Sequence, residues 1–128
     1  MRRVISILMI VAVFAAIAFG QTEKRINFDK GKSSAVVKGN TGQSGVYYVV
    51  RAKQGQMLML DASPAARIGV KVETNGRYGH SVLLREEKGG HYEIGLEEAG
   101  DYTIFIGSLS GKPVQFTLTV GIRRLTDI

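Results

Sequence analysis

Apolar side chains recur at every second position along most of this chain from residue 21 onward. The clearest case is the segment 114–122, in which apolar residues alternate with glutamine, threonine and glycine. A period of two is typical of a β-strand that buries one face, whereas an amphipathic helix repeats about every 3.6 residues. The pattern therefore predicts strands, and it predicts no helix after residue 20.

The segment 96–106, LEEAGDYTIFI, carries the strongest fold signal. Its polar turn reverses the chain, and Tyr102, Ile104 and Ile106 then fall on one face of a new strand. We expect these three side chains in the core. We also expect Asp101 to accept backbone hydrogen bonds within its own turn, as aspartate commonly does.

Short alternating segments separated by turn residues continue along the rest of the chain. Many short strands joined by Gly-rich turns favour an all-β fold, an antiparallel β-sandwich or jelly roll of about eight or nine strands. The Asn75-Gly76 pair suits a tight hairpin turn. The expected strands cover residues 25–28, 34–38, 46–52, 57–62, 68–74, 82–86, 92–96, 101–106 and 114–122.

The first 20 residues have the pattern of a secretory signal peptide. Two arginines precede the apolar run Val4–Phe19, and small residues precede a cleavage site after Gly20. The alternative is a membrane anchor, but the run has 16 residues, fewer than the roughly 20 that span a bilayer. We therefore expect a signal at 1–20 and a single domain at 21–128. That domain would be periplasmic or extracellular, with no membrane span after cleavage.

Composition removes several classes of function. The chain has no cysteine, which excludes disulfides, thiolate catalysis and Cys-ligated zinc or iron–sulfur clusters. Loss of the two signal-peptide arginines lowers the net charge by two, from +6 to +4. No basic stripe with interleaved stacking aromatics is present, so nucleic acid is not an expected partner.

No catalytic or metal-binding pattern stands out. His80 and His91 lie at turn edges outside any recognisable metal-ligand spacing, and the G-x-S-x-G motif of a nucleophile elbow is absent. The adjacent pairs Glu86-Glu87 and Glu97-Glu98 fall at the ends of expected strands, where we expect solvated turn residues rather than a calcium site. The sequence therefore predicts a protein that is not an enzyme and that has no cofactor or metal.

Binding is expected at loops, because loops on a rigid sandwich usually carry it. The segments 77–80 and 108–113 combine hydrogen-bond donors and aromatic or flexible residues, and tyrosine and arginine are common interface anchors. The candidate partner-binding residues are Tyr47, Arg77, Tyr78, His80, Ser108 and Lys112.

Several segments, taken in order, carry a resemblance to a known family: 26–35 (INFDKGKSSA), Gly39, Tyr48, 52–56 (AKQGQ), 100–104 (GDYTI) and 116–120 (FTLTV). Their order resembles the bacterial pre-peptidase C-terminal (PPC) β-sandwich. Within that group it is most similar to the small secreted form found in periplasmic inhibitors of g-type lysozyme. The resemblance covers nearly all of residues 24–122.

The resemblance implies a compact all-β domain that acts by binding, and for the inhibitors it implies loops that enter a lysozyme cleft. Residues 44–48 also match S-G-x-x-Y, a motif associated with some lysozyme inhibitors, but Tyr48 shares a face with Val46 and Val50 and is expected in the core. Such inhibitors tend to carry an Arg- and Asn-rich insertion after the Gly-Asp-Tyr strand. Here that place holds only residues 107–113, without arginine.

Two functions therefore stay open. The first is a secreted or periplasmic binding protein for a protein, such as a lysozyme, or for a glycan. The second is a structural or accessory module of the cell envelope without inhibitory activity.

Overall fold

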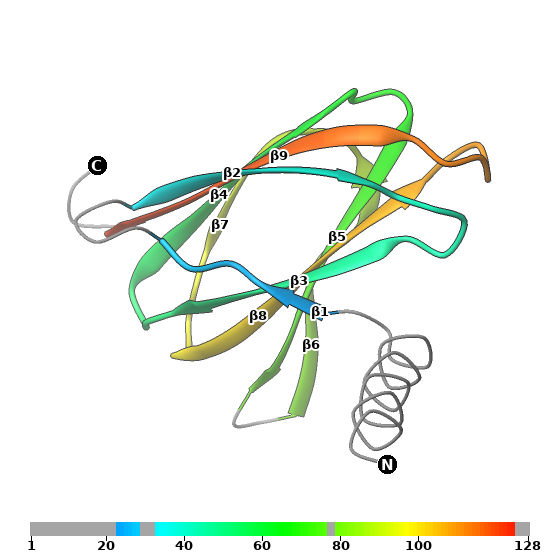
Figure 1. Cartoon of the computed structure of the whole chain (residues 1–128). Coiled ribbons are helices and arrows are strands. Elements are labelled where there is room, and N and C mark those ends of the chain that lie inside the picture. Colours follow the sequence, from blue (N-terminus) through cyan, green and yellow to red (C-terminus); the bar gives the residue numbers. More distant parts are fainter. Residues whose placement is uncertain (1–22, 29–32, 77–78, 125–128) are drawn as a thin grey trace, which may run out of the picture.

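The computed structural model describes residues 23–28, 33–76 and 79–124 (Figure 1). The predicted signal at 1–20, together with Arg77 and Tyr78, lies outside the described residues. Within them, nine strands form two sheets that face each other, and no helix is present. The strands are β1 (Glu23–Arg25), β2 (Ser34–Asn40), β3 (Val46–Ala52), β4 (Gln56–Ser63), β5 (Ile68–Gly76), β6 (Gly79–Lys88), β7 (Gly90–Gly95), β8 (Gly100–Ser108) and β9 (Gln115–Arg124).

The predicted all-β sandwich is confirmed, and its strand order is non-sequential. One sheet has five strands in the order β1-β3-β8-β5-β6, and the other has four in the order β2-β9-β4-β7. All pairings are antiparallel except that of β1 with β3. Strand β8, which begins at the Gly-Asp-Tyr sequence, occupies the middle of the five-stranded sheet.

The first strand differs from the prediction. Alternation placed a strand at 25–28, but β1 ends at Arg25 and runs parallel to β3. Ile26 still donates a backbone hydrogen bond to Val49 O (2.8 Å) and is buried. The next strand, β2, belongs to the opposite sheet. The alternating residues after Arg25 are therefore part of the connection between the two sheets and not of a strand.

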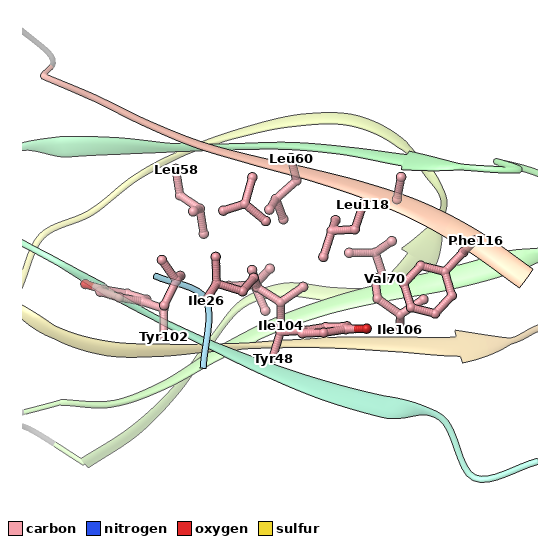
Figure 2. Packing of buried hydrophobic residues seen from close by; sticks show 14 of the residues in the cluster. Ile26, Tyr48, Leu58, Leu60, Val70, Tyr102, Ile104, Ile106, Phe116 and Leu118 are labelled. Atoms are coloured by element: carbon pink, nitrogen blue, oxygen red, sulfur yellow. The ribbon is translucent and has the colours of Figure 1, made fainter. Parts of the chain in front are cut away.

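The core lies between the two sheets and is formed by the inward faces of strands β2 to β9, together with Ile26 after β1 (Figure 2). Tyr102, Ile104 and Ile106 are at most 1% exposed, as the sequence predicted. Tyr48 is also buried, and its ring meets that of Phe116 edge-on at a centroid distance of 6.2 Å. Burial of each large apolar side chain contributes about 1.5–3 kcal/mol.

Two hydrogen bonds fix the turn that leads into β8. The Tyr102 hydroxyl donates to Glu98 O at 2.5 Å, and the Thr74 hydroxyl on β5 donates to Asp101 O at 2.9 Å. Burial raises the pKa of Tyr102, so the phenol stays protonated and remains a donor. Tyr102 therefore stabilises the protein in two ways, since its ring packs in the core and its hydroxyl fixes the turn before β8.

Asp101 does not cap its own turn, contrary to the expectation. Its carboxylate accepts two hydrogen bonds from the Arg25 guanidinium, at 3.1 and 3.0 Å. The reason is its position on the outer face of β8, where Arg25 reaches across β3 from the edge strand. The Arg25 hydrogen bonds lower the pKa of Asp101, and the charges of Arg25 and Arg51 act in the same direction.

Loops gather at both ends of the sandwich. At the end where β8 finishes, called here the Ser108 end, Leu109 N donates to Arg67 O (3.1 Å) and Thr41 N donates to Val114 O (2.9 Å). These bonds tie the connections after β2, β4 and β8 together. The β3–β4 turn and the start of β8 lie at the opposite end, called the Gly100 end (Figure 1).

Candidate protein-binding surface

Two aromatic rings lie side by side on the outer face of the five-stranded sheet. Tyr47 on β3 and Phe105 on β8 are paired in register, and their ring centroids are 4.9 Å apart. Their chain neighbours Tyr48, Ile104 and Ile106 point into the core, so the alternation of the strands directs these two rings outward. Both are only partly buried, which leaves aromatic surface available to a partner.

Glycines beside the rings make room for Phe105. A Cβ placed on Gly45 would lie 2.3 Å from the Phe105 ring, and one on Gly107 would lie 2.8 Å from it. The Phe105 ring therefore packs directly against the backbone at Gly45 and Gly107. Leu109 packs in the same way over Gly69, which pairs with Gly107 from strand β5.

Leu109 extends this apolar surface toward the Ser108 end. Leu109 is 47% exposed. We call Tyr47, Phe105 and Leu109 together the aromatic platform.

Replacement of Gly45 by alanine is expected to destabilise the protein more than the same change at Gly42. Both glycines have positive φ, +82° and +58°, where a Cβ costs about 1–2 kcal/mol. Only Gly45 also meets the Phe105 ring, whereas nothing lies within 4 Å of a Cβ on Gly42. Urea denaturation of the two variants measures the difference. Equal losses would show that Phe105 does not rest on Gly45.

The loop after β8 is closed by its own hydrogen bonds. The Ser108 hydroxyl donates to Lys112 O (2.5 Å), and Lys112 N donates to the Ser110 hydroxyl (3.3 Å). Ser108 is thus engaged in shaping the loop, while the Lys112 side chain is exposed and makes no salt bridge within the described residues. A short loop of this kind presents Lys112 on a preorganised backbone.

The residues proposed from the sequence lie at two different ends. Tyr47, which belongs to the aromatic platform, lies at the Ser108 end together with Ser108 and Lys112. His80 lies on β6 near the Gly100 end, because β5 and β8 are antiparallel. Its ring contacts Asn75 (Nδ1–Oδ1 3.0 Å) and Glu73 (Nε2–Oε2 2.9 Å).

His91 forms a second polar cluster, on the outer face of the four-stranded sheet. Its Nδ1 lies 2.9 Å from Asp61 Oδ1, and its Nε2 lies 3.5 Å from Glu93 Oε2. The hydrogen bond with Asp61 raises the pKa of His91, and the charge of Asp61 and the contact with Glu93 act in the same direction. All three side chains are about half exposed, so the cluster fits a solvated surface pair better than a catalytic site.

The raised pKa of His91 makes the free energy of unfolding depend on pH. The folded pKa exceeds the unfolded value of about 6.5, so the contribution of His91 is fully present below that pH and is lost as pH rises through the folded pKa. Asp61→Asn is expected to return the His91 pKa toward its ordinary value in an NMR titration. Glu86→Gln, which changes a distant carboxylate, is the control. An unaltered His91 pKa in Asp61→Asn would contradict the assignment.

Among the described residues, no group of three or more His, Cys, Asp or Glu side chains is arranged to hold a metal ion. In that same part of the chain, no helix has the length and apolar character needed to cross a bilayer.

Comparison with solved structures identifies the fold. No known protein family and no curated protein matches the sequence. The structure aligns with PliG of Aeromonas hydrophila, a periplasmic lysozyme inhibitor of g-type lysozyme, with a TM-score of 0.69 and 25% identity over 80% of this chain and 96% of that one. The pre-peptidase C-terminal domain of a Bacillus anthracis collagenase aligns with a TM-score of 0.50 and 10% identity over 81% and 97%. The chain is a PPC-like β-sandwich.

A second inhibitor agrees with this PPC-like assignment. The PliG of Salmonella Typhimurium, also a periplasmic lysozyme inhibitor of g-type lysozyme, aligns with a TM-score of 0.62 and 18% identity over 81% of this chain and all of that one. The resemblance noted from the sequence is therefore confirmed at the level of fold, with higher TM-scores for PliG than for the collagenase domain.

Sequence reasoning missed two members of the aromatic platform, Phe105 and Leu109. The sequence predicts an outward position for Phe105, because the even-numbered residues of its strand are expected in the core, but it does not single Phe105 out as a binding residue. The sequence signal for this position is an aromatic residue at an outward strand position, followed two residues later by Gly107. The pairing of Phe105 with Tyr47 required the fold, because 58 positions separate them in the chain.

Proposed function

We propose that this protein is an exported, non-enzymatic binding protein and that its partner is a g-type lysozyme, whose activity it inhibits. The likeness to PliG supports the class of partner. The observation that carries the proposal is the aromatic platform, above all its solvent-facing pair of rings, Tyr47 on β3 and Phe105 on β8.

The platform has the properties of an interface anchor. Aromatic side chains have few rotatable bonds and lose little entropy when a partner covers them. Tyr47 and Phe105 are further restrained by their contact with each other and by the glycines beneath Phe105. Rigid aromatic residues at the centre of a contact commonly provide most of its binding energy.

Lys112 supplies charge complementarity beside the platform. Lysozymes, like most glycoside hydrolases, hold carboxylates in the cleft that binds their substrate. An exposed lysine without a salt bridge in the described part of the chain suits such a cleft. Because the 107–113 segment is short, we infer that the sheet face and this loop make the contact together.

Isothermal titration of the purified protein into g-type lysozyme tests the proposal, with c-type and i-type lysozymes as specificity controls. We expect saturable one-to-one binding to the g-type enzyme and weaker or no binding to the other two. Absence of heat with all three would overturn the lysozyme assignment and favour a structural or accessory module of the envelope. Retention on peptidoglycan instead would assign the platform to a glycan.

A further inference from the structure

A groove of about 750 Å³ opens at the Gly100 end, away from the aromatic platform. It lies where β3 and β9 end and β4 begins, at the left in Figure 1. Phe28 and Ile122 give it an apolar part. Four cationic residues also line it: Arg51, Lys53, Arg123 and Arg124.

The charge of this groove is not balanced by its own lining. None of the described residues that line it is Asp or Glu, and none of the four cations takes part in a salt bridge within the described chain. Asp101 is the nearby acid that acts on Arg51, but its carboxylate is already occupied by Arg25. Cations that gather around a hollow without acidic partners favour an anionic occupant.

The size and the apolar lining restrict that occupant further. A volume of about 750 Å³ falls in the usual range of small-molecule sites, about 300–1,000 Å³. Phe28 and Ile122 offer apolar contact that an inorganic ion cannot use. Arginine side chains bind phosphate through paired N–H groups, and a phosphate monoester carries a charge of about −1.5 to −2 at neutral pH.

We propose that this groove binds a phosphate monoester joined to an apolar chain, with the phosphate between the cations and the chain against Phe28 and Ile122. The site is separate from the lysozyme-binding surface proposed above, since the two lie at opposite ends of the sandwich. A failure of this protein to inhibit lysozyme would therefore not contradict the proposed phosphate site, and the reverse also holds.

Calorimetric titration with dodecyl phosphate, below its critical micelle concentration, tests this site in the purified protein. We expect one saturable site, which weakens as sodium chloride is raised because part of the affinity is electrostatic. Inorganic phosphate lacks the chain, dodecanoate carries less charge, and dodecylphosphocholine adds a compensating positive charge. Each is expected to bind at least about tenfold more weakly than dodecyl phosphate.

The variant Arg123→Gln/Arg124→Gln removes two cations from the groove and is expected to weaken dodecyl phosphate binding by at least about tenfold. The matched control is Arg67→Gln/Arg85→Gln, which lowers the net charge equally at exposed positions outside the groove. Circular dichroism establishes that both variants are folded. Equal binding by the two double variants, tight binding of inorganic phosphate alone, or no saturable binding by the unmodified protein would each overturn the proposal.

Discussion

Replacement of Tyr102 by alanine is expected to lower the free energy of unfolding by about 3–5 kcal/mol, the usual cost of removing a large buried aromatic side chain. Tyr102 is 1% exposed, and its hydroxyl holds the turn before β8 through Glu98. A domain of this size has a free energy of unfolding of about 5–15 kcal/mol, so the substitution would remove a large part of it. Equilibrium urea denaturation measures it.

Tyr102→Phe is the matched control for this substitution. It keeps the ring in the core but removes the hydrogen bond to Glu98 O, so a loss of about 1 kcal/mol is expected. The two variants together separate packing from hydrogen bonding. A loss below about 1 kcal/mol in Tyr102→Ala would contradict the conclusion that this ring is packed in the core and holds the turn before β8.

Truncation of the aromatic platform is expected to weaken lysozyme binding strongly. Tyr47→Ala and Phe105→Ala should each cost about 2 kcal/mol, or about 30-fold in dissociation constant, if both rings are interface anchors. The double variant should lose less than the sum of the two, because the rings contact each other. Titration calorimetry with g-type lysozyme measures all three.

Val36→Ser is the control for the platform variants. Val36 is 63% exposed and lies on β2 in the other sheet, so its truncation also removes exposed apolar surface but leaves the platform intact. Its affinity for lysozyme should equal that of the unmodified protein. Equal weakening by Val36→Ser, or unchanged affinity in the double platform variant with its fold retained, would remove the platform from the interface.

The sequence predicted the core well where alternation is regular. In β8 it placed Tyr102, Ile104 and Ile106 inward, and all three are buried. It did not predict which strands are neighbours, because β8 pairs with β3 and β5, far away in the chain. The bounds of β1 also differ from the predicted 25–28, since alternation continues past Arg25 although the strand does not, and its parallel pairing with β3 was not predicted.

The candidate site was predicted only in part, and the reason is topological. Tyr47, Ser108 and Lys112 come to one end, whereas His80 is carried to the other by the antiparallel course of β5 and β8. Phe105 could not be paired with Tyr47 until the strand register was known. The cationic groove likewise joins Arg51 to Arg124, residues that no local pattern connects.

The most direct test of the account is a cell-lysis assay in which g-type lysozyme acts on susceptible bacteria in the presence of the purified protein. We predict that lysis stops at a molar excess of the unmodified protein and of Val36→Ser. The Tyr47→Ala/Phe105→Ala variant should need a much higher concentration for the same protection. Undiminished lysis at large excess of the unmodified, folded protein would contradict the proposed function.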